Sequence, residues 1–258
     1  MTARDAVDAA VDALTAAGVE TPRLDAELLI ADALGVDRAA LVVDPSLPIP
    51  PPAARLLSER IRRRVAREPV AYILGHRGFR RIELQVDSRV LIPRPETELL
   101  VEIAQSLPAG ARVHDVGTGS GAVALALRDE RPDLVVSASD ASPHALEVAR
   151  ANGLDAELAV GLPAGAYDLV VANLPYVRED EWEELAPEIR LYEPREALVA
   201  GADGLDAIRA LVAQAPSGIR LALEHAPAQT AAVRGLLRSP RVYPDLAGHS
   251  RVTVGFAP

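Results

Sequence analysis

The sequence predicts an α/β protein with three parts: a helical bundle over residues 1–75, a β-hairpin linker over 76–95 and a larger α/β region over 96–258. Two observations lead to this division. Apolar residues recur at spacings of three and four up to residue 67, which is typical of helices that bury one face. From residue 111 onward, short apolar runs alternate with amphipathic segments, which predicts a mostly parallel sheet covered by helices on both faces.

The composition excludes several classes of chemistry. The 258 residues include no cysteine, and all 27 basic residues are arginines. A cysteine nucleophile, a disulfide, a Schiff-base lysine and a Walker-type phosphate loop are therefore impossible. No apolar run approaches the ~20 residues of a membrane-spanning helix, and the first residues lack the pattern of a signal peptide. We expect a cytoplasmic protein without a membrane partner, and the net charge of −10 argues against direct nucleic-acid binding.

Three helices are predicted in the N-terminal part. Gly18 and Gly35 end the first two, and a proline-rich segment over 45–52 separates them from the third, because proline cannot continue a helix. The third helix carries a cluster of arginines: Arg60, Arg62, Arg63, Arg64 and Arg67. They form either a solvated helix face or a contact surface for an acidic or nucleic-acid partner.

The linker contains strand-like runs on either side of Asp87-Ser88-Arg89, which we expect to be the turn of the hairpin. A helix should begin within the segment 93–98 and continue to Ala104, since proline and acidic residues favour the first turn of a helix. The strands expected in the α/β region are 111–116, 134–139, 167–172, 219–224 and 252–256. The expected helices are 121–128, 143–151, 206–215 and 228–237.

A glycine-rich turn follows the first of these strands, over residues 117–121. Glycines at this place let the backbone approach a ligand at the start of the next helix. The spacing of Gly117, Gly119 and Ala122 also fits the dinucleotide fingerprint, so the turn alone leaves nicotinamide binding open, as well as a structural turn without a ligand.

Two acidic residues favour a different ligand. Asp115, just before the turn, can hold a cationic or amino-bearing group but would repel a pyrophosphate. Asp140, at the end of the second strand, can accept both hydroxyls of a ribose, or can cap the turn at Ser142 and Pro143. S-adenosylmethionine has an amino-acid tail, a sulfonium and a ribose but no phosphate, and fits this pattern better than NAD.

The third strand leads into Asn173-Leu174-Pro175-Tyr176. Ligands of open parallel sheets bind beyond the carboxyl ends of the strands, so this turn should face the same crevice as the glycines. The Asn173 side-chain oxygen and a neighbouring backbone carbonyl could each accept an N–H of a planar amide or arylamine and hold its nitrogen toward a methyl donor. Tyr176 would supply an aromatic wall.

These motifs, together with Leu91–Glu98, resemble the bacterial peptide chain release factor glutamine methyltransferase family (HemK/PrmC type), and the resemblance covers almost the whole chain. It implies an N-terminal helical substrate-recognition domain, a hairpin linker and a Rossmann-like S-adenosylmethionine-dependent methyltransferase domain. It also implies methyl transfer to the side-chain N5 of the glutamine in the Gly-Gly-Gln motif of class-1 release factors, which would be the protein partners of a monomeric enzyme.

The resemblance assigns roles to residues of the two turns. The expected cofactor-binding residues are Asp115, Gly117, Thr118, Gly119, Ser120, Gly121, Asp140 and Asn173. The expected substrate-binding residues are Asn173, Leu174, Pro175 and Tyr176, of which Asn173, Pro175 and Tyr176 are the candidate catalytic residues. The chain departs from the family at Leu174, where the usual residue is proline, so the rigidity of this turn must come from packing. The residue that contacts adenine is open between Glu157 and Leu158.

Two other functions are compatible with the motifs. An adenine-N6 methyltransferase could hold an exocyclic amine in the same turn, but it would be expected to present a basic face or a target-binding domain. A non-catalytic S-adenosylmethionine-binding regulatory protein is the third possibility. The five histidines show no ligand spacing, so no metal site is predicted, and His225 is expected to pack or hydrogen-bond near the end of its strand.

Overall fold

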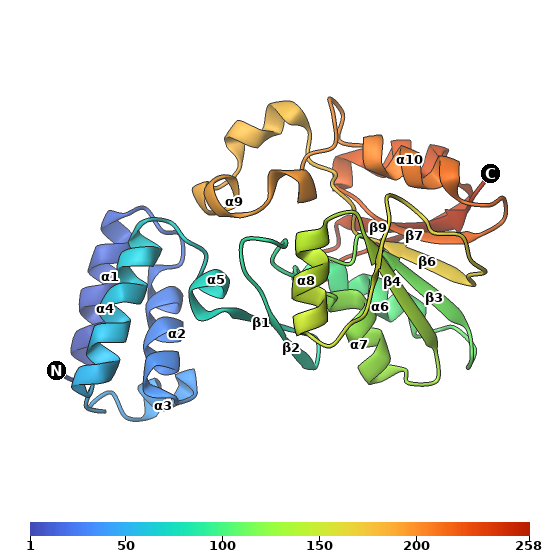
Figure 1. Ribbon diagram of the computed structural model, residues 1–258. Helices are drawn as coiled ribbons and strands as arrows, with labels where there is room; N and C mark the ends of the chain where they lie inside the picture. Colours follow the sequence, from blue (N-terminus) through green and yellow to red (C-terminus); the bar gives the residue numbers. More distant parts are fainter. The chain divides into compact units, whose positions relative to one another are not determined.

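The computed structural model describes residues 1–258. It divides into two compact units: the first comprises Met1–Gly75 and Ala186–Tyr192, and the second comprises His76–Leu185 and Glu193–Pro258. Figure 1 shows that the first unit is helical and that the second is built on a sheet. None of the helices combines the length and the apolar character that crossing a bilayer requires.

The first unit buries two apolar clusters, and the side chains of Val11 and Ile61 pack against both. Its helices are α1 (Ala3–Ala16), α2 (Pro22–Leu34), α3 (Arg38–Val43), α4 (Pro51–Val65), α5 (Val70–Leu74) and α9 (Pro187–Tyr192). Thr2 and Asp5 form a capping box that begins α1, and Gly35 ends α2 in the left-handed conformation. Leu29, Ile30 and Leu57 meet in the core. The three predicted helices are α1, α2 and α4; α3 and α5 are too short to show a periodic pattern.

The arginines near the end of α4 do not form a solvated face, and that prediction is wrong for most of them. Arg64 is buried and its Nε lies 2.7 Å from Oδ2 of Asp25. The other pairs are Arg60 with Asp32, Arg63 with Glu68, and both Arg64 and Arg67 with Glu188. Of the five, only Arg62 is exposed. Four of the five cations are therefore paired with carboxylates within the unit.

The second unit begins with the hairpin of β1 (His76–Phe79) and β2 (Ile82–Gln85). Phe79 pairs with Ile82, so the tight turn is Arg80-Arg81 and not the predicted Asp87-Ser88-Arg89. The apolar side chains of Val90 and Ile92 suggested a second strand, but both residues are buried outside any strand. The predicted helix start is confirmed: a short 3-10 turn, η1 (Pro95–Thr97), leads into α6 (Glu98–Ala104).

A seven-stranded sheet with the order β5-β4-β3-β6-β7-β9-β8 forms the centre of the second unit. Its strands are β3 (Arg112–Val116), β4 (Val135–Asp140), β5 (Glu157–Leu158), β6 (Leu169–Ala172), β7 (Arg220–Glu224), β8 (Arg238–Pro244) and β9 (Ser250–Phe256). The strands from β5 to β7 run parallel, and β9 pairs antiparallel with both β7 and β8. The chain leaves β3 toward β4 and β5 and later returns beside β3 as β6, which makes the β3–β6 boundary the switch point where ligands bind.

Helices cover this sheet on two sides, and α10 lies above it and α7 below it in Figure 1. The helices are α6, α7 (Ala122–Glu130), α8 (Pro143–Ala151), α10 (Asp206–Gln214) and α11 (Thr230–Gly235), with further 3-10 turns η2 (Glu179–Glu184), η3 (Arg195–Ala197) and η4 (Pro227–Gln229). Ile208 and Leu211 of α10 pack against Val170, Leu221 and Leu223 of the sheet. The predicted α/β class is therefore confirmed.

Candidate active site

One cavity of about 670 Å³ lies at the carboxyl ends of the parallel strands of the second unit. Its position follows from the strand register: Val116 pairs with Ser139 on one side and with Ala172 on the other. The residues that come next along the chain, Gly117, Asp140 and Asn173, therefore leave three neighbouring strands at one level. All three line the cavity, so the structure brings together the segments that the sequence singled out.

The glycine turn needs its glycines for two different reasons. Gly117, Gly119 and Gly121 have φ values of 73°, 57° and 89°, in the left-handed region that other residues avoid. Gly117 and Gly119 line the cavity. Gly121 does not; it begins α7, and a Cβ atom there would lie 2.9 Å from Cδ2 of Leu154. Gly121 therefore lets the turn pack closely against Leu154 on the side away from the cavity.

Asp115 is buried at the base of the cavity, with 2% of its surface exposed. Its Oδ2 accepts hydrogen bonds from Oγ1 of Thr118 at 2.6 Å and from N of Ala124 at 3.3 Å. Burial is the main reason that the pKa of Asp115 is raised to about 6; the hydrogen bonds from Thr118 and Ala124 act against this rise, and the charge of Asp140 adds to it. A cationic ligand group beside Asp115 would favour the ionised form.

Asp140 connects the end of β4 to the glycine turn. Its Oδ2 accepts the N–H of Gly119 at 2.8 Å, and its Oδ1 accepts the N–H of Ser142 at 2.8 Å. Ser142, rather than Asp140, caps α8 by accepting the N–H of Ala145. Burial raises the pKa of Asp140. Asp140 thus makes the local turn bond that the sequence allowed, and its carboxylate also lines the cavity.

Asn173 faces the cavity with its amide held from one side. Its Nδ2 donates a hydrogen bond to Oγ1 of Thr97 at 2.9 Å, which leaves Oδ1 as the free acceptor of the side chain. Leu174 and Pro175 also line the cavity. Leu174 packs against the core cluster that contains Val116 and Leu211. This packing is the substitute for the fixed φ that a proline would provide.

Tyr176 does not line this cavity, and its polar groups bind residues of other segments. Its hydroxyl donates to Oε1 of Glu224 at 3.3 Å, and its main-chain oxygen accepts from Nε2 of Gln229 at 2.9 Å. Burial, followed by the charge of Glu224, raises the pKa of Tyr176. Tyr176 is therefore a neutral hydrogen-bond donor in this arrangement.

Sequence reasoning missed two polar residues behind Asn173. Thr97 lines the cavity and holds the Asn173 amide, and Glu224 is fully buried below it. A signal for Glu224 was present, since an acid at the end of an apolar strand is unusual in a core. Nothing in the sequence linked it to Thr97.

The segment after β5 lines the cavity through Ala159, Val160 and Gly161. Glu157 and Leu158 form β5 itself and are exposed, so neither of the two candidates for the adenine contact is among the lining residues. Gln214 also lines the cavity and lies against this segment, where its Oε1 accepts the N–H of Leu162 at 3.2 Å.

Two of the five histidines, His114 and His225, are buried and make hydrogen bonds inside the fold. His225 contacts the carbonyl oxygen of Ala226 through Nδ1 and Oγ1 of Thr253 through Nε2, as expected for a packed residue at the end of β7. No group of three or more histidine, cysteine or acidic side chains in the structure could hold a metal ion.

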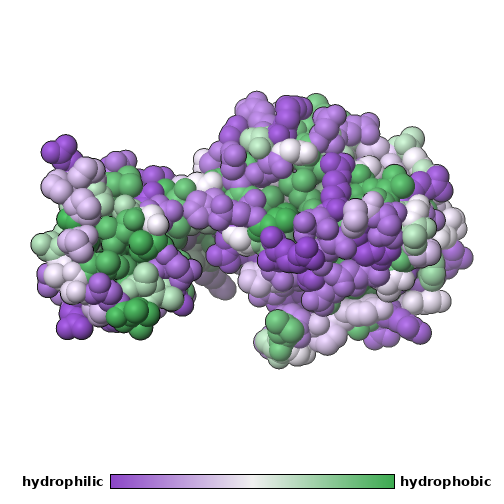
Figure 2. All heavy atoms as spheres, turned by 90° about the horizontal axis from the view of Figure 1, so that it is seen from below, coloured by the Kyte–Doolittle hydropathy of each residue, from purple (hydrophilic) through white to green (hydrophobic).

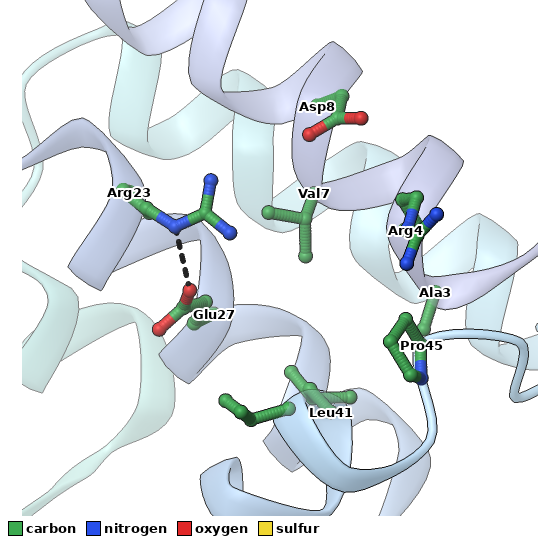
Figure 3. Close-up of a pocket in the computed structure, with 9 residues that line it drawn as sticks. Ala3, Arg4, Val7, Asp8, Arg23, Glu27, Leu41 and Pro45 are labelled. Atoms are coloured by element: carbon green, nitrogen blue, oxygen red, sulfur yellow. Dashed lines mark ion pairs between the residues drawn. The ribbon is translucent and has the colours of Figure 1, made fainter.

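A second pocket lies in the helical unit, between α1, α2 and α3 (Figure 3). Its volume is about 190 Å³, which is small for a ligand site. Arg23 and Glu27 form an ion pair of 3.0 Å across its polar wall, and Val7 and Leu41 form its apolar floor. Nothing in this pocket resembles a catalytic arrangement.

The comparisons with known proteins agree with this geometry. The family model described as "PrmC N-terminal domain" matches residues 5–75, and the model described as "Methyltransferase small domain" matches residues 95–201. The solved structure of the hMettl16 catalytic domain has the same fold, with a TM-score of 0.52 and 13% identity, over 81% of this chain and 82% of that chain. The fold and the cavity define an enzyme of the methyltransferase class.

Two curated relatives make the assignment more specific. The release factor glutamine methyltransferase of Cereibacter sphaeroides is 42% identical over 271 residues, which cover 98% of this chain and 97% of that protein. The protein of the same name from Mycolicibacterium smegmatis is 44% identical over 241 residues, which cover 86% and 84%. The chain belongs to the release factor glutamine methyltransferase family, and the resemblance found in the sequence is confirmed.

Proposed function

We propose that the chain transfers a methyl group from S-adenosylmethionine to the side-chain N5 of the glutamine in the Gly-Gly-Gln motif of class-1 peptide chain release factors. The observation that carries this proposal is the pairing of Val116 with Ala172. It directs the glycine turn and Asn173 into one cavity, so a donor on the first and an acceptor on the second would meet. The names of the relatives support the same substrate class.

The cavity fits the cofactor in size and in charge. Its volume of about 670 Å³ lies within the range of small-molecule sites. The glycine turn lets a ligand approach the backbone, Asp140 can accept ribose hydroxyls, and Asp115 can pair with an amino group. The carboxylates of Asp115 and Asp140 beside the turn would repel a pyrophosphate, which favours S-adenosylmethionine over NAD.

Asn173 and Leu174 would hold the substrate. Oδ1 of Asn173 and the carbonyl oxygen of Leu174 can each accept one N–H of the glutamine amide, which orients its nitrogen and favours the positive charge that develops during transfer. The cofactor supplies an electrophilic methyl group on a sulfonium. The nitrogen forms the new C–N bond, the S–C electron pair stays on sulfur, and the proton lost from nitrogen passes to water, so no strong base is needed.

The two units would divide the work. We assign substrate recognition to the helical domain over residues 1–75, linkage to the hairpin segment 76–95 and methyl transfer to residues 96–258. In support, every residue that lines the large cavity belongs to the second unit. The helical unit presents exposed apolar side chains, including Val42 and Val43 at 71% and 83% exposure, and Figure 2 shows hydrophobic side chains gathered on its surface.

The proposal is tested by incubating the protein with S-adenosylmethionine and a purified class-1 release factor, and by locating the modified residue with tandem mass spectrometry. A single methyl group on the glutamine of the Gly-Gly-Gln motif is the expected result. Methylated adenine in RNA or DNA together with an unmodified release factor would favour an adenine-N6 methyltransferase. Calorimetric binding of the cofactor without transfer to any of these substrates would favour a regulatory protein.

A further inference from the structure

A line of polar groups leads from the cavity into the core behind Asn173. Nδ2 of Asn173 donates to Oγ1 of Thr97 at 2.9 Å. The Thr97 hydroxyl in turn faces the carboxylate of Glu224 and lowers its pKa. Glu224 is fully buried at the end of β7; its Oε1 accepts the Tyr176 hydroxyl at 3.3 Å, whereas its Oε2 has no hydrogen-bond partner. A buried acceptor that is left over needs a donor, and the Thr97 hydroxyl, which hydrogen-bonds to the Glu224 carboxyl group, can supply one.

The direction of hydrogen bonding along this line is fixed by Glu224. An ionised carboxylate only accepts, so the Thr97 proton points to Glu224 and the Thr97 oxygen can only accept from Asn173. The amide of Asn173 must then present its NH2 group to Thr97 and its oxygen to the cavity. The opposite orientation would put an NH2 group against the substrate amide, where two sets of donors would face each other.

We propose that Glu224 and Thr97 are positioning residues that hold the Asn173 amide with Oδ1 toward the substrate nitrogen. This inference rests on the proposed function, and it adds the groups that set the polarity of the acceptor. Neither residue takes part in bond making. Thr97 reaches Asn173 directly, and Glu224 acts through Thr97.

The surroundings of Glu224 make the direction of the hydrogen bonds between Glu224, Thr97 and Asn173 dependent on pH. Burial is the main reason that the pKa of Glu224 is raised to about 7; the charge of Glu96 on η1 acts in the same direction, and Thr97, Arg251 on β9 and Tyr176 act against it. Arg94 is the remaining charged group near Tyr176. Once protonated, Glu224 can donate to Thr97, and Thr97 is then free to donate toward Asn173. Both hydrogen bonds then run in the opposite direction.

Glu224→Gln is the most direct test, because it changes one atom. The Tyr176 hydroxyl donates to Oε1, so the glutamine oxygen should stay there and the new NH2 group should face Thr97. We expect kcat at pH 8 to fall ~10-fold or more, with the affinity for S-adenosylmethionine unchanged. Thr97→Val should have the same effect, and Thr97→Ser, which keeps the hydroxyl, should restore kcat to within ~3-fold of the wild type.

The pH profile separates positioning from a general structural role. The kcat of the wild type should decline below pH ~7, and this acid limb should be missing in Glu224→Gln. Glu130→Gln is the control, since Glu130 is a partly buried carboxylate of the second unit that pairs with Arg80 and does not line the cavity. The Glu130→Gln variant should keep the kcat of the wild type and its decline at acid pH. Wild-type kcat and an intact acid limb in both Glu224→Gln and Thr97→Val would overturn the inference.

A measurement on the protein without substrate keeps this test independent of the proposed function. The side-chain amide resonance of Asn173, assigned by its loss in Asn173→Ala, should shift with a midpoint near pH 7 in a ¹⁵N-edited spectrum. The shift should vanish in Glu224→Gln and in Thr97→Val. If the amide resonance titrates in the same way in both variants as in the wild type, the inference is contradicted even if glutamine methylation is observed. If the resonance titrates as expected but the protein methylates no release factor, only the proposed function is refuted.

Discussion

A Cβ atom on Gly117 would lie 3.0 Å from Cδ2 of Leu174, so the turn after β3 and the turn after β6 touch each other. The first turn would hold the methyl donor and the second the acceptor. Leu174 also packs against the core through Leu211 and Val116. The Leu174 side chain therefore holds the turn after β6 directly against the turn after β3.

This contact predicts that Gly117→Ala impairs both turns. Alanine at a φ of 73° is strained by roughly 1–2 kcal/mol, and its Cβ must also displace Leu174. We expect cofactor affinity, measured by calorimetry, to fall ~10-fold or more. Gly110→Ala is a suitable control, because Gly110 has a φ of 78° but no atom near its Cβ position. Equal effects of the two substitutions on cofactor affinity would show that the contact with Leu174 is unimportant.

The two asparagines of the chain should respond differently to the same substitution. Asn173→Ala removes the acceptor for the substrate amide, so turnover should fall ~100-fold or more while cofactor affinity stays nearly unchanged. Asn152 instead donates to the carbonyl oxygen of Ser120 at 2.9 Å and supports the glycine turn. Asn152→Ala should therefore weaken cofactor binding first. Unimpaired turnover of Asn173→Ala would refute the proposed role of Asn173.

Cofactor affinity should depend on the ionisation of Asp115. Burial raises the pKa of Asp115 to about 6 in the free protein, and a bound amino group would lower it again. Binding of S-adenosylmethionine should therefore weaken as the pH falls through ~6, with proton release measurable by calorimetry in buffers of different ionisation enthalpy. Asp115→Asn should bind weakly at every pH. If its affinity keeps the pH dependence of the wild type, another group is responsible.

Glu224→Gln should stabilise the fold at alkaline pH although it impairs turnover. The pKa of Glu224 rises from 4.5 to about 7 on folding, so the folded protein holds a proton that the unfolded chain releases between these values. Stability is therefore lost as the pH rises through this window, by on the order of 3 kcal/mol. The free energy of unfolding of the variant, from urea titrations, should exceed that of the wild type at pH 8 and match it near pH 4. Lower stability of the variant at pH 8 would contradict the raised pKa.

Most of the sheet could be predicted because its strands are buried on both faces. The run at 167–172 is mostly apolar and ends at Asn173, and the run at 111–116 ends at the glycine turn, so the apolar residues and the turn residues that follow them predict the same strands. The strand β8 escaped prediction because Pro240 and Pro244 argue against pairing, yet an edge strand tolerates them. The hairpin turn was misplaced because Val90 is apolar and buried without belonging to a strand.

The candidate site was predictable where one turn carries the chemistry by itself. The residues of the glycine turn and Asn173 could be identified from their residue types and from their positions directly after a strand. Thr97 and Glu224 do not, because their importance comes from a hydrogen bond between η1 and the substrate turn and from burial at the end of β7. The contact of Tyr176 could not be predicted either, since only the three-dimensional arrangement shows that its hydroxyl donates to Glu224.

The central claim is that one cavity holds a methyl donor against an amide whose hydrogens are bound by Asn173 and by the carbonyl group of Leu174. A crystal structure with S-adenosylhomocysteine and a Gly-Gly-Gln peptide tests it most directly. The account predicts the glutamine NH2 group within hydrogen-bond distance of both oxygens, with its nitrogen directed at the sulfur atom. A glutamine bound elsewhere, or an Asn173 side chain turned away from the donor, would contradict it.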